Sequence, residues 1–371
     1  MKTNYFFLVS IFLLGLNVYV NGQNKSIVTN SFYSGTIGTD TIQLYLKNQG
    51  SFLSGYFYYE KDGETIEFTG NQSRSKRNIS LITNYSNETG QIKINLKRNN
   101  SSLKGEYKIK KEKSPINLQL IREAYTTENY IITDSFLLGP NAKKFPFYDF
   151  TISAEWPLEN NPSHHFIRQE LLKILDPEAL WQNVGMPEIL DSIRNYYKND
   201  YLSLKEGLTE EEKKDLLTSA SLNWFQDSET TIETISENLS TIHHINTIYT
   251  GGAHGSHKEI FLNLNLSDNT VLEIYDVFTE DGLIILPSLI DQSFRALNKI
   301  DPSTSLAELG FFEDRIGKIS EQFRINKKGV SFIYNEYEIT TYSTMPVSVF
   351  LPYSMINLYL QPSFKMLVNK N

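Results

Sequence analysis

The chain contains no cysteine among its 371 residues. This absence excludes disulfide bonds, thiolate metal sites, a cysteine nucleophile and a cysteine-linked lipid anchor. Burial of apolar side chains must therefore stabilise the fold, and a chain of this length can form two or three hydrophobic cores.

Long hydrophobic runs are also scarce. The apolar run at 5–16 is interrupted by one serine and one glycine, and it follows a positively charged Lys2. A run of about a dozen residues is too short to span a membrane, which takes about 20. The run and the small residues before Gln23 predict a signal peptide at residues 1–22. We expect the mature chain to be secreted across the inner membrane, to be periplasmic or extracellular, and to contain no membrane span.

Basic residues are fewer than acidic ones. The sequence has 35 lysines and arginines against 43 acids, a formal net charge of −8. Removal of residues 1–22, which contain one lysine and no acid, changes this charge to −9. The balance argues against nucleic acid or anionic lipid as a partner and suits a basic one, although a mild negative charge is ordinary for soluble proteins.

Residues 23–125 are predicted to form an antiparallel β module. Short runs of alternating apolar and polar residues are separated by turn clusters rich in glycine, asparagine and aspartate. This pattern is typical of an antiparallel meander, a sandwich or a small barrel. The pattern Leu-x-Gly-x-aromatic occurs at 53–57 and again at 103–107, and we expect Gly55 and Gly105 to relieve crowding where strands bend.

The remaining sequence is predicted to be α+β. Residues 126–210 are interpreted as a linker and small α+β domain, and residues 211–371 as a larger α+β domain with a mainly antiparallel sheet and a few packed helices. Helices and strands occur in blocks here, without the regular alternation of a doubly wound sheet. The expected helices cover 163–175, 188–197, about 209–224, 283–297 and 354–360, and the long strands lie at 230–249 and 257–266.

The most informative segment is Tyr-Thr-Gly-Gly-Ala-His-Gly at 249–255. Gly251 and Gly252 allow backbone conformations that other residues avoid, and they lie between two strand-like runs. We expect Tyr249 and His254 to contribute to a binding surface shaped by this bend. His254 would then hold the bend through a hydrogen bond to the backbone.

A metal site built on histidines is the alternative interpretation of this segment. His243 or His244 could lie opposite His254 or His257 on a hairpin, where Glu259 or Asp276 would complete a zinc site. Adjacent strand residues point to opposite faces, so only one of His243 and His244 could take part. The spacing matches no metal motif, and we expect no metal and no cofactor.

The C-terminal strands offer carboxylates and aromatic rings. Glu336 and Glu338 are predicted to share one face of a strand about 7 Å apart, a separation that could serve a two-carboxylate hydrolase, although such pairs are usually a solvated face. Tyr334 and Tyr337 lie among several aromatic residues whose rings can stack on sugars or anchor a protein partner. Packing within the core is the alternative interpretation for these rings.

The second half resembles the C-terminal domain shared by lysozyme-sensing anti-sigma factors (RsiV-like) and secreted peptidoglycan deacetylases (PdaC-like). The resemblance rests on the glycine segment, on the run at 323–339, and on Val-Ser-Val-Phe-Leu-Pro-Tyr at 347–353. The stretch 128–210 is similar, more loosely, to the small domain that precedes it in those proteins. The chain lacks the sigma-binding segment of the former and the catalytic domain of the latter. The resemblance therefore implies an accessory or sensor domain, which in the anti-sigma factors binds lysozyme.

These observations predict a non-catalytic, secreted cell-envelope protein. Its partner would be a protein such as lysozyme, or a cell-wall or host glycan, and the residues expected to bind are Tyr249, Gly251, Gly252, His254, Tyr334 and Tyr337. The alternative is an envelope hydrolase acting on glycan or peptidoglycan, with a histidine and carboxylate site near His254.

Overall fold

The computed structural model describes residues 22–61, 63–83, 91–123, 126–139, 146–176, 184–212, 219–342 and 346–369. The predicted signal peptide at 1–22 lies outside these residues except for Gly22, which begins the first strand. Within the described ranges, no helix is both long enough and apolar enough to cross a membrane.

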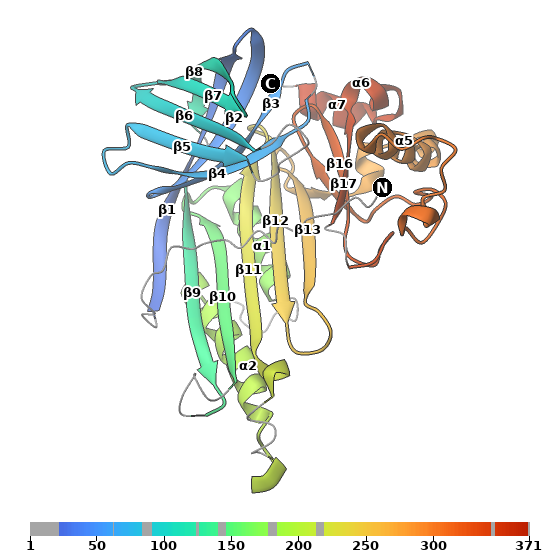
Figure 1. Cartoon of the computed structure of the whole chain (residues 1–371). Coiled ribbons are helices and arrows are strands. Elements are labelled where there is room, and N and C mark those ends of the chain that lie inside the picture. Colours follow the sequence, from blue (N-terminus) through green and yellow to red (C-terminus); the bar gives the residue numbers. More distant parts are fainter. Residues whose placement is uncertain are drawn as a thin grey trace.

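The N-terminal module is a closed, barrel-like sheet of eight antiparallel strands (Figure 1). Each strand pairs with the next one along the chain, and the first pairs also with the eighth, which closes the sheet. The predicted all-β module is thus confirmed. Its strands are β1 (Gly22–Ile37), β2 (Asp40–Gln49), β3 (Phe52–Tyr59), β4 (Ile66–Gln72), β5 (Asn78–Thr83), β6 (Ile92–Asn99), β7 (Ser102–Ile109) and β8 (Glu112–Glu123).

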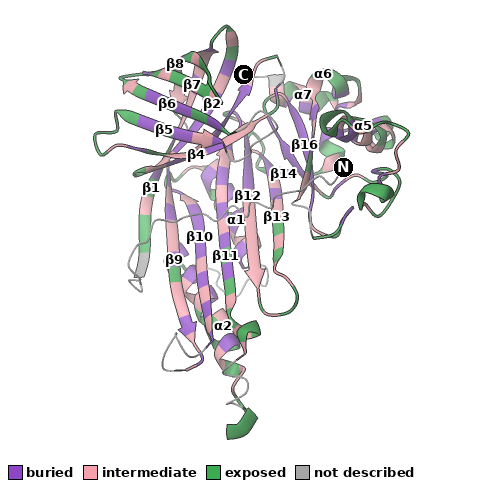
Figure 2. Cartoon of the chain, viewed as in Figure 1, coloured by how far each residue is buried: buried purple, intermediate pink, exposed green. Residues whose placement is uncertain are grey.

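Side chains fill the interior of this module. Buried and more exposed residues alternate along strands such as β5 and β6, and Figure 2 colours the module by burial. The buried residues form one apolar cluster that includes Leu44, Phe57 and Leu96. Glycines stand where neighbouring strands approach most closely. A Cβ on Gly105 would lie 1.9 Å from the carbonyl oxygen of Asn95, so only glycine fits at this position.

A second sheet continues from the first through the long strand β1. Its first seven residues pair with β9, and the order then runs β9-β10-β11-β12-β13-β14. All neighbours are antiparallel except β10 and β11. The helices α1 and α2 cover one face and bury the apolar residues of β9 to β12 (Figure 1). The elements are β9 (Thr127–Leu137), β10 (Phe147–Pro157), α1 (Pro162–Leu175), α2 (Met186–Ser203), β11 (Trp224–Thr234), β12 (Leu239–Tyr249), β13 (Ser256–Asn265) and β14 (Thr270–Leu272).

The C-terminal part packs helices against a three-stranded antiparallel sheet. Its order is β15-β16-β17, and the core contains apolar residues of the helices and of all three strands. The predicted α+β class is confirmed. The elements are α4 (Ile274–Val277), α5 (Glu280–Asn298), β15 (Gln322–Ile325), β16 (Gly329–Tyr334), β17 (Val347–Pro352), α6 (Tyr353–Ile356) and α7 (Pro362–Asn369), with 3-10 turns at Ala220–Leu222, Ala307–Leu309 and Asn357–Tyr359.

Some expected elements differ from the observed ones. The helix expected at about 209–224 begins with a capping box, since the amides of Thr209 and Glu212 each bond to the other's side chain, but Trp224 already belongs to β11. The strand expected from residue 336 is a turn. The second sheet also crosses the domain boundary that the sequence suggested at 210/211.

Candidate contact surface

The glycine segment forms the loop between β12 and β13. Gly251 and Gly252 have φ angles of +93° and +98°, a region that L-residues rarely adopt. The Tyr249 hydroxyl donates to the carbonyl of Gly252 at 3.1 Å, which braces the turn. The two glycines therefore set the shape of the loop, and Tyr249 holds it.

His254 connects this loop to the C-terminal part. Its Nδ1 lies 2.6 Å from the carbonyl oxygen of Gly255, which can only accept, so Nδ1 carries the proton. In the neutral ring, Nε2 then accepts from the hydroxyl of Tyr337 at 2.8 Å. The imidazole also stacks on Tyr342, with ring centroids 3.7 Å apart and an interplanar angle of 11°. Three rings from two distant segments are thus fixed against one another.

Tyr337 is held out of the core by an unusual backbone. Its φ angle is +64°, and its turn is closed by bonds from its own amide to Thr340 and from Glu338 to Asn335. A bulky residue in this region costs roughly 1–2 kcal/mol. Tyr337 and Tyr342 are 52% and 46% exposed. The fold therefore maintains an unfavourable conformation that presents a tyrosine to solvent.

The turn that carries Tyr337 is fastened to the edge of β13 by amide side chains. Asn335 accepts from the amide of Glu259 at 2.8 Å and donates to the carbonyl of the same residue at 2.9 Å, as a paired strand would. Gln322 accepts from the amide of Phe261 at 2.8 Å. These bonds fix the position of Tyr337 relative to the glycine loop.

A second aromatic pair lies at the same end of the sheet. Phe225 and Tyr249 are cross-strand partners on β11 and β12, and their rings stack with centroids 6.1 Å apart. Phe225 is 42% exposed. We call the five rings Phe225, Tyr249, His254, Tyr337 and Tyr342 the aromatic surface. Figure 2 shows exposed residues along the adjoining loop.

Most of the expected binding residues meet at this place, with one exception. Tyr249, Gly251, Gly252, His254 and Tyr337 come together. Tyr334 is separate, because it is 1% exposed and its hydroxyl donates to the carbonyl of Lys318 at 2.6 Å. We therefore assign Tyr334 to the core. Phe225 was missed, because its position opposite Tyr249 follows from the register of β11 and β12, which no local sequence pattern gives.

The other histidines form a separate group on the sheet. His243 and His257 flank Glu259, with Nε2-to-carboxylate distances of 2.9 Å and 3.3 Å. Burial alone would raise the pKa of Glu259, but these two hydrogen bonds outweigh it and hold the pKa well below its usual range. His257 Nδ1 also lies 3.0 Å from the hydroxyl of Thr247. Among the residues that the structure describes, no group of three or more potential ligands has the geometry to hold a metal ion.

His244 occupies the opposite face of β12 from His243. Its Nδ1 lies 2.8 Å from the hydroxyl of Thr230, and burial lowers its pKa to about 4. Asp276 lies apart from both, because its carboxylate accepts from the amide of Glu273 at the start of α4. The expectation that only one of the adjacent histidines could join such a group agrees with this geometry.

The prediction that Glu336 and Glu338 share a strand face is wrong. Both belong to the turn around Tyr337, because the left-handed backbone of that tyrosine interrupts the strand. One oxygen of Glu336 is buried and lacks a hydrogen-bond partner among the described residues. The separation estimated for an extended strand therefore does not apply to this pair.

Comparisons with known proteins find a family match in the C-terminal part. Residues 275–354 match DUF3298, described as a protein of unknown function. No curated protein matches the chain significantly. A DUF3298 family member from Bacteroides fragilis NCTC 9343 is similar in structure, with a TM-score of 0.57 and 23% identity over 66% of this chain and 98% of that chain. A DUF3298 family protein from Pseudomonas aeruginosa PAO1 gives a TM-score of 0.44 and 17% identity over 63% and 94%.

The match to DUF3298 runs from α4 to the start of α6, so it includes Tyr337 and Tyr342, whereas the glycine loop precedes its first residue. The likeness to the Bacteroides fragilis structure covers about two thirds of this chain and shows a shared fold. The aromatic surface therefore lies where the part of the chain that matches DUF3298 meets the preceding sheet.

Proposed function

We propose that the protein is a non-catalytic recognition protein of the cell envelope and that the aromatic surface is its contact face. The observation that carries this proposal is the clamp at His254, which fixes two half-exposed tyrosines by a 2.8 Å hydrogen bond and a 3.7 Å ring stack. Exposed, preorganised tyrosines supply contact area at a small cost in conformational entropy.

The bonding of His254 favours recognition over hydrolysis. The Nε2 lone pair of His254 is engaged by the Tyr337 hydroxyl and Nδ1 donates to a carbonyl, so taking a proton from water or substrate would require the bond to Tyr337 to break. Within the described part of the chain, no carboxylate bonds to this imidazole. The alternative of an envelope hydrolase at His254 therefore has little geometric support.

The partner that we propose is a basic protein of the lysozyme type. The chain has a formal net charge of −8, which favours encounter with a cationic partner. The resemblance to the lysozyme-sensing anti-sigma factors points the same way. A cell-wall or host glycan is the second candidate, because exposed tyrosine rings can stack on sugars.

The test is calorimetric titration of the mature chain with hen lysozyme and with cell-wall oligosaccharides. Replacing Tyr337 and Tyr342 together by alanine should weaken binding by about tenfold or more, because aromatic anchors dominate such interfaces. Tyr275→Ala is the matched control, since Tyr275 is exposed on α4 of the same domain. Equal affinity of the double variant and the wild type would refute the assignment. Peptidoglycan turnover that disappears in His254→Ala would favour the hydrolase.

We also propose that the protein is secreted, because the apolar run at 5–16 is typical of a signal peptide. Export from a bacterial host followed by mass spectrometry should give a mature chain that begins at Gln23. Retention of residues 1–22 in the exported protein would contradict this proposal.

A further inference from the structure

Positive charge is concentrated in one part of an acidic chain. Residues 71–120 contain eleven lysines and arginines and three acids, an excess of eight positive charges, although the whole chain has a net charge of −8. The remainder therefore carries −16. The net charge of the whole chain hides this segregation, and the basic segment runs from the end of β4 into β8.

The strand register places these charges in rows on the outer face of the N-terminal module. Lys97 of β6 lies directly opposite Lys104 of β7. Four residues away along the same strands, Lys93 lies opposite Lys108, which in turn faces Lys113 of β8. All five lysines are exposed. Two rows of lysines therefore run across the strands. The rows are about 13 Å apart, because four strand residues separate them and each residue spans about 3.3 Å.

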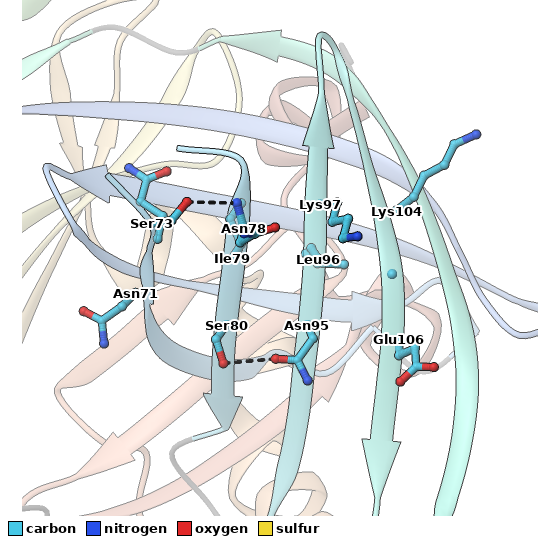
Figure 3. A pocket seen from close by; sticks show the side chains of 12 residues that line it. Asn71, Ser73, Asn78, Ile79, Ser80, Asn95, Leu96, Lys97, Lys104 and Glu106 are labelled. Carbon is cyan, nitrogen blue, oxygen red and sulfur yellow. Dashed lines mark hydrogen bonds between the residues drawn. The ribbon is translucent and has the colours of Figure 1, made fainter. Parts of the chain in front are cut away.

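A polar row lies between the two rows of lysines. Asn71, Ser80, Asn95 and Glu106 are successive cross-strand partners on β4 to β7, and the Ser80 hydroxyl donates to Asn95 at 3.1 Å. These residues line a groove of about 620 Å³ whose edge also includes Lys97 and Lys104 (Figure 3). Gly105 also contributes to its wall.

The arrangement of the lysines opposes folding. Like charges directly opposite on paired strands are destabilising. Lys113 has a partner in Glu106 at 3.1 Å, but Lys93, Lys97, Lys104 and Lys108 form no ion pair with any residue that the structure describes. A cationic face that is maintained against its own repulsion is suited to a polyanion, which would supply the missing countercharge.

We infer that the outer face of β4–β7 binds an acidic polysaccharide, one that carries carboxylate or sulfate groups. The lysine rows would pair with its anionic groups, and the amide and hydroxyl side chains between them would donate to and accept from its sugar hydroxyls. The outward row contains no aromatic ring, whereas sites for single-stranded nucleic acid use such rings to stack bases. A polysaccharide therefore fits this face better.

The experiment measures binding of the mature chain to polygalacturonate and heparin, with neutral dextran and duplex DNA for comparison. Replacing Lys97 and Lys104 together by glutamine should weaken polysaccharide binding about tenfold at low ionic strength, with a shallower salt dependence. Adding Lys93→Gln and Lys108→Gln should bring the loss to about a hundredfold. Lys258→Gln with Lys318→Gln is the matched control, because both lysines are exposed elsewhere in the chain and removal of two charges there should leave binding unchanged.

The variants also report on their own folding. Because repulsion is removed, the Lys97→Gln, Lys104→Gln protein should melt at or above the temperature of the wild type. Failure of the wild type to bind either acidic polysaccharide, or equal binding by the fourfold variant, would overturn the site. Tighter binding of duplex DNA than of both polysaccharides would overturn the ligand class. Binding to dextran with the affinity seen for polygalacturonate would overturn the role of charge.

Discussion

Arg324 and Glu233 form a two-bond ion pair between the C-terminal domain and the middle sheet. Nε and Nη2 of Arg324 donate to the two carboxylate oxygens at 3.0 Å and 2.8 Å, and Nη1 donates to Glu67 of the N-terminal module at 2.9 Å. Burial would lower the pKa of Arg324, but the two carboxylates raise it above its usual value. One guanidinium thus joins all three parts of the chain.

Arg324→Met should destabilise the protein by about 3 kcal/mol, because it leaves the nearly buried carboxylate of Glu233 without its partner. The free energy of unfolding from urea denaturation is the measurement. Glu67→Gln is the control, since the Glu67 side chain is 38% exposed and its loss should cost less than about 1 kcal/mol. Equal effects of the two substitutions would mean that the bond to Glu233 is not the dominant one.

Local patterns in the sequence identified most elements of this fold. Alternation of apolar residues predicted the strands from Thr41 to Ile121, and periodicity predicted α1, α2 and α5, because these signals depend on neighbours in the chain. The closure of β1 on β8 could not be derived in this way, since it depends on pairing between residues 79 to 92 positions apart. The sequence therefore left a meander, a sandwich and a barrel as alternatives.

In the candidate site, too, local features could be predicted and long-range contacts could not. Gly251 and Gly252 predicted a bend in the chain, but the stacking of His254 on Tyr342 results from tertiary packing between residues 88 positions apart. The prediction that the alternating run after Tyr334 forms a strand was wrong. There the side chain of Asn335 binds the edge of β13, and Tyr337 adopts a left-handed backbone, so tertiary contacts override the local pattern.

Tyr337→Asn should separate binding from stability. Asparagine tolerates the left-handed region that Tyr337 occupies at φ +64°, so we expect unfolding free energy within about 1 kcal/mol of the wild type, or above it. The exposed ring would be lost, and binding of the partner should weaken about tenfold. Paired melting and titration experiments measure both effects. A large loss of stability would show that the Tyr337 ring mainly supports the fold.

His244 should make stability depend on pH. Burial lowers its pKa to about 4 from an unfolded value of 6.5, so protonation favours the unfolded chain. The stability contributed by neutral His244 is fully present above pH 6.5 and is lost as the pH falls toward 4, by at most about 3 kcal/mol. Urea denaturation at several pH values should show a flatter profile for His244→Gln. His165→Gln, at an exposed position, should keep the wild-type profile.

Gly105→Ala should be among the most damaging substitutions in the N-terminal module. A Cβ there would lie 1.9 Å from the carbonyl oxygen of Asn95, so β6 and β7 must move apart and lose hydrogen bonds. We expect a loss of more than about 3 kcal/mol. Gly50→Ala is the control, because φ is +65° but no atom lies within 4 Å of its Cβ, and a cost of about 1 kcal/mol follows from the backbone alone. If the two variants unfold at the same urea concentration, close strand approach is not what requires glycine at Gly105.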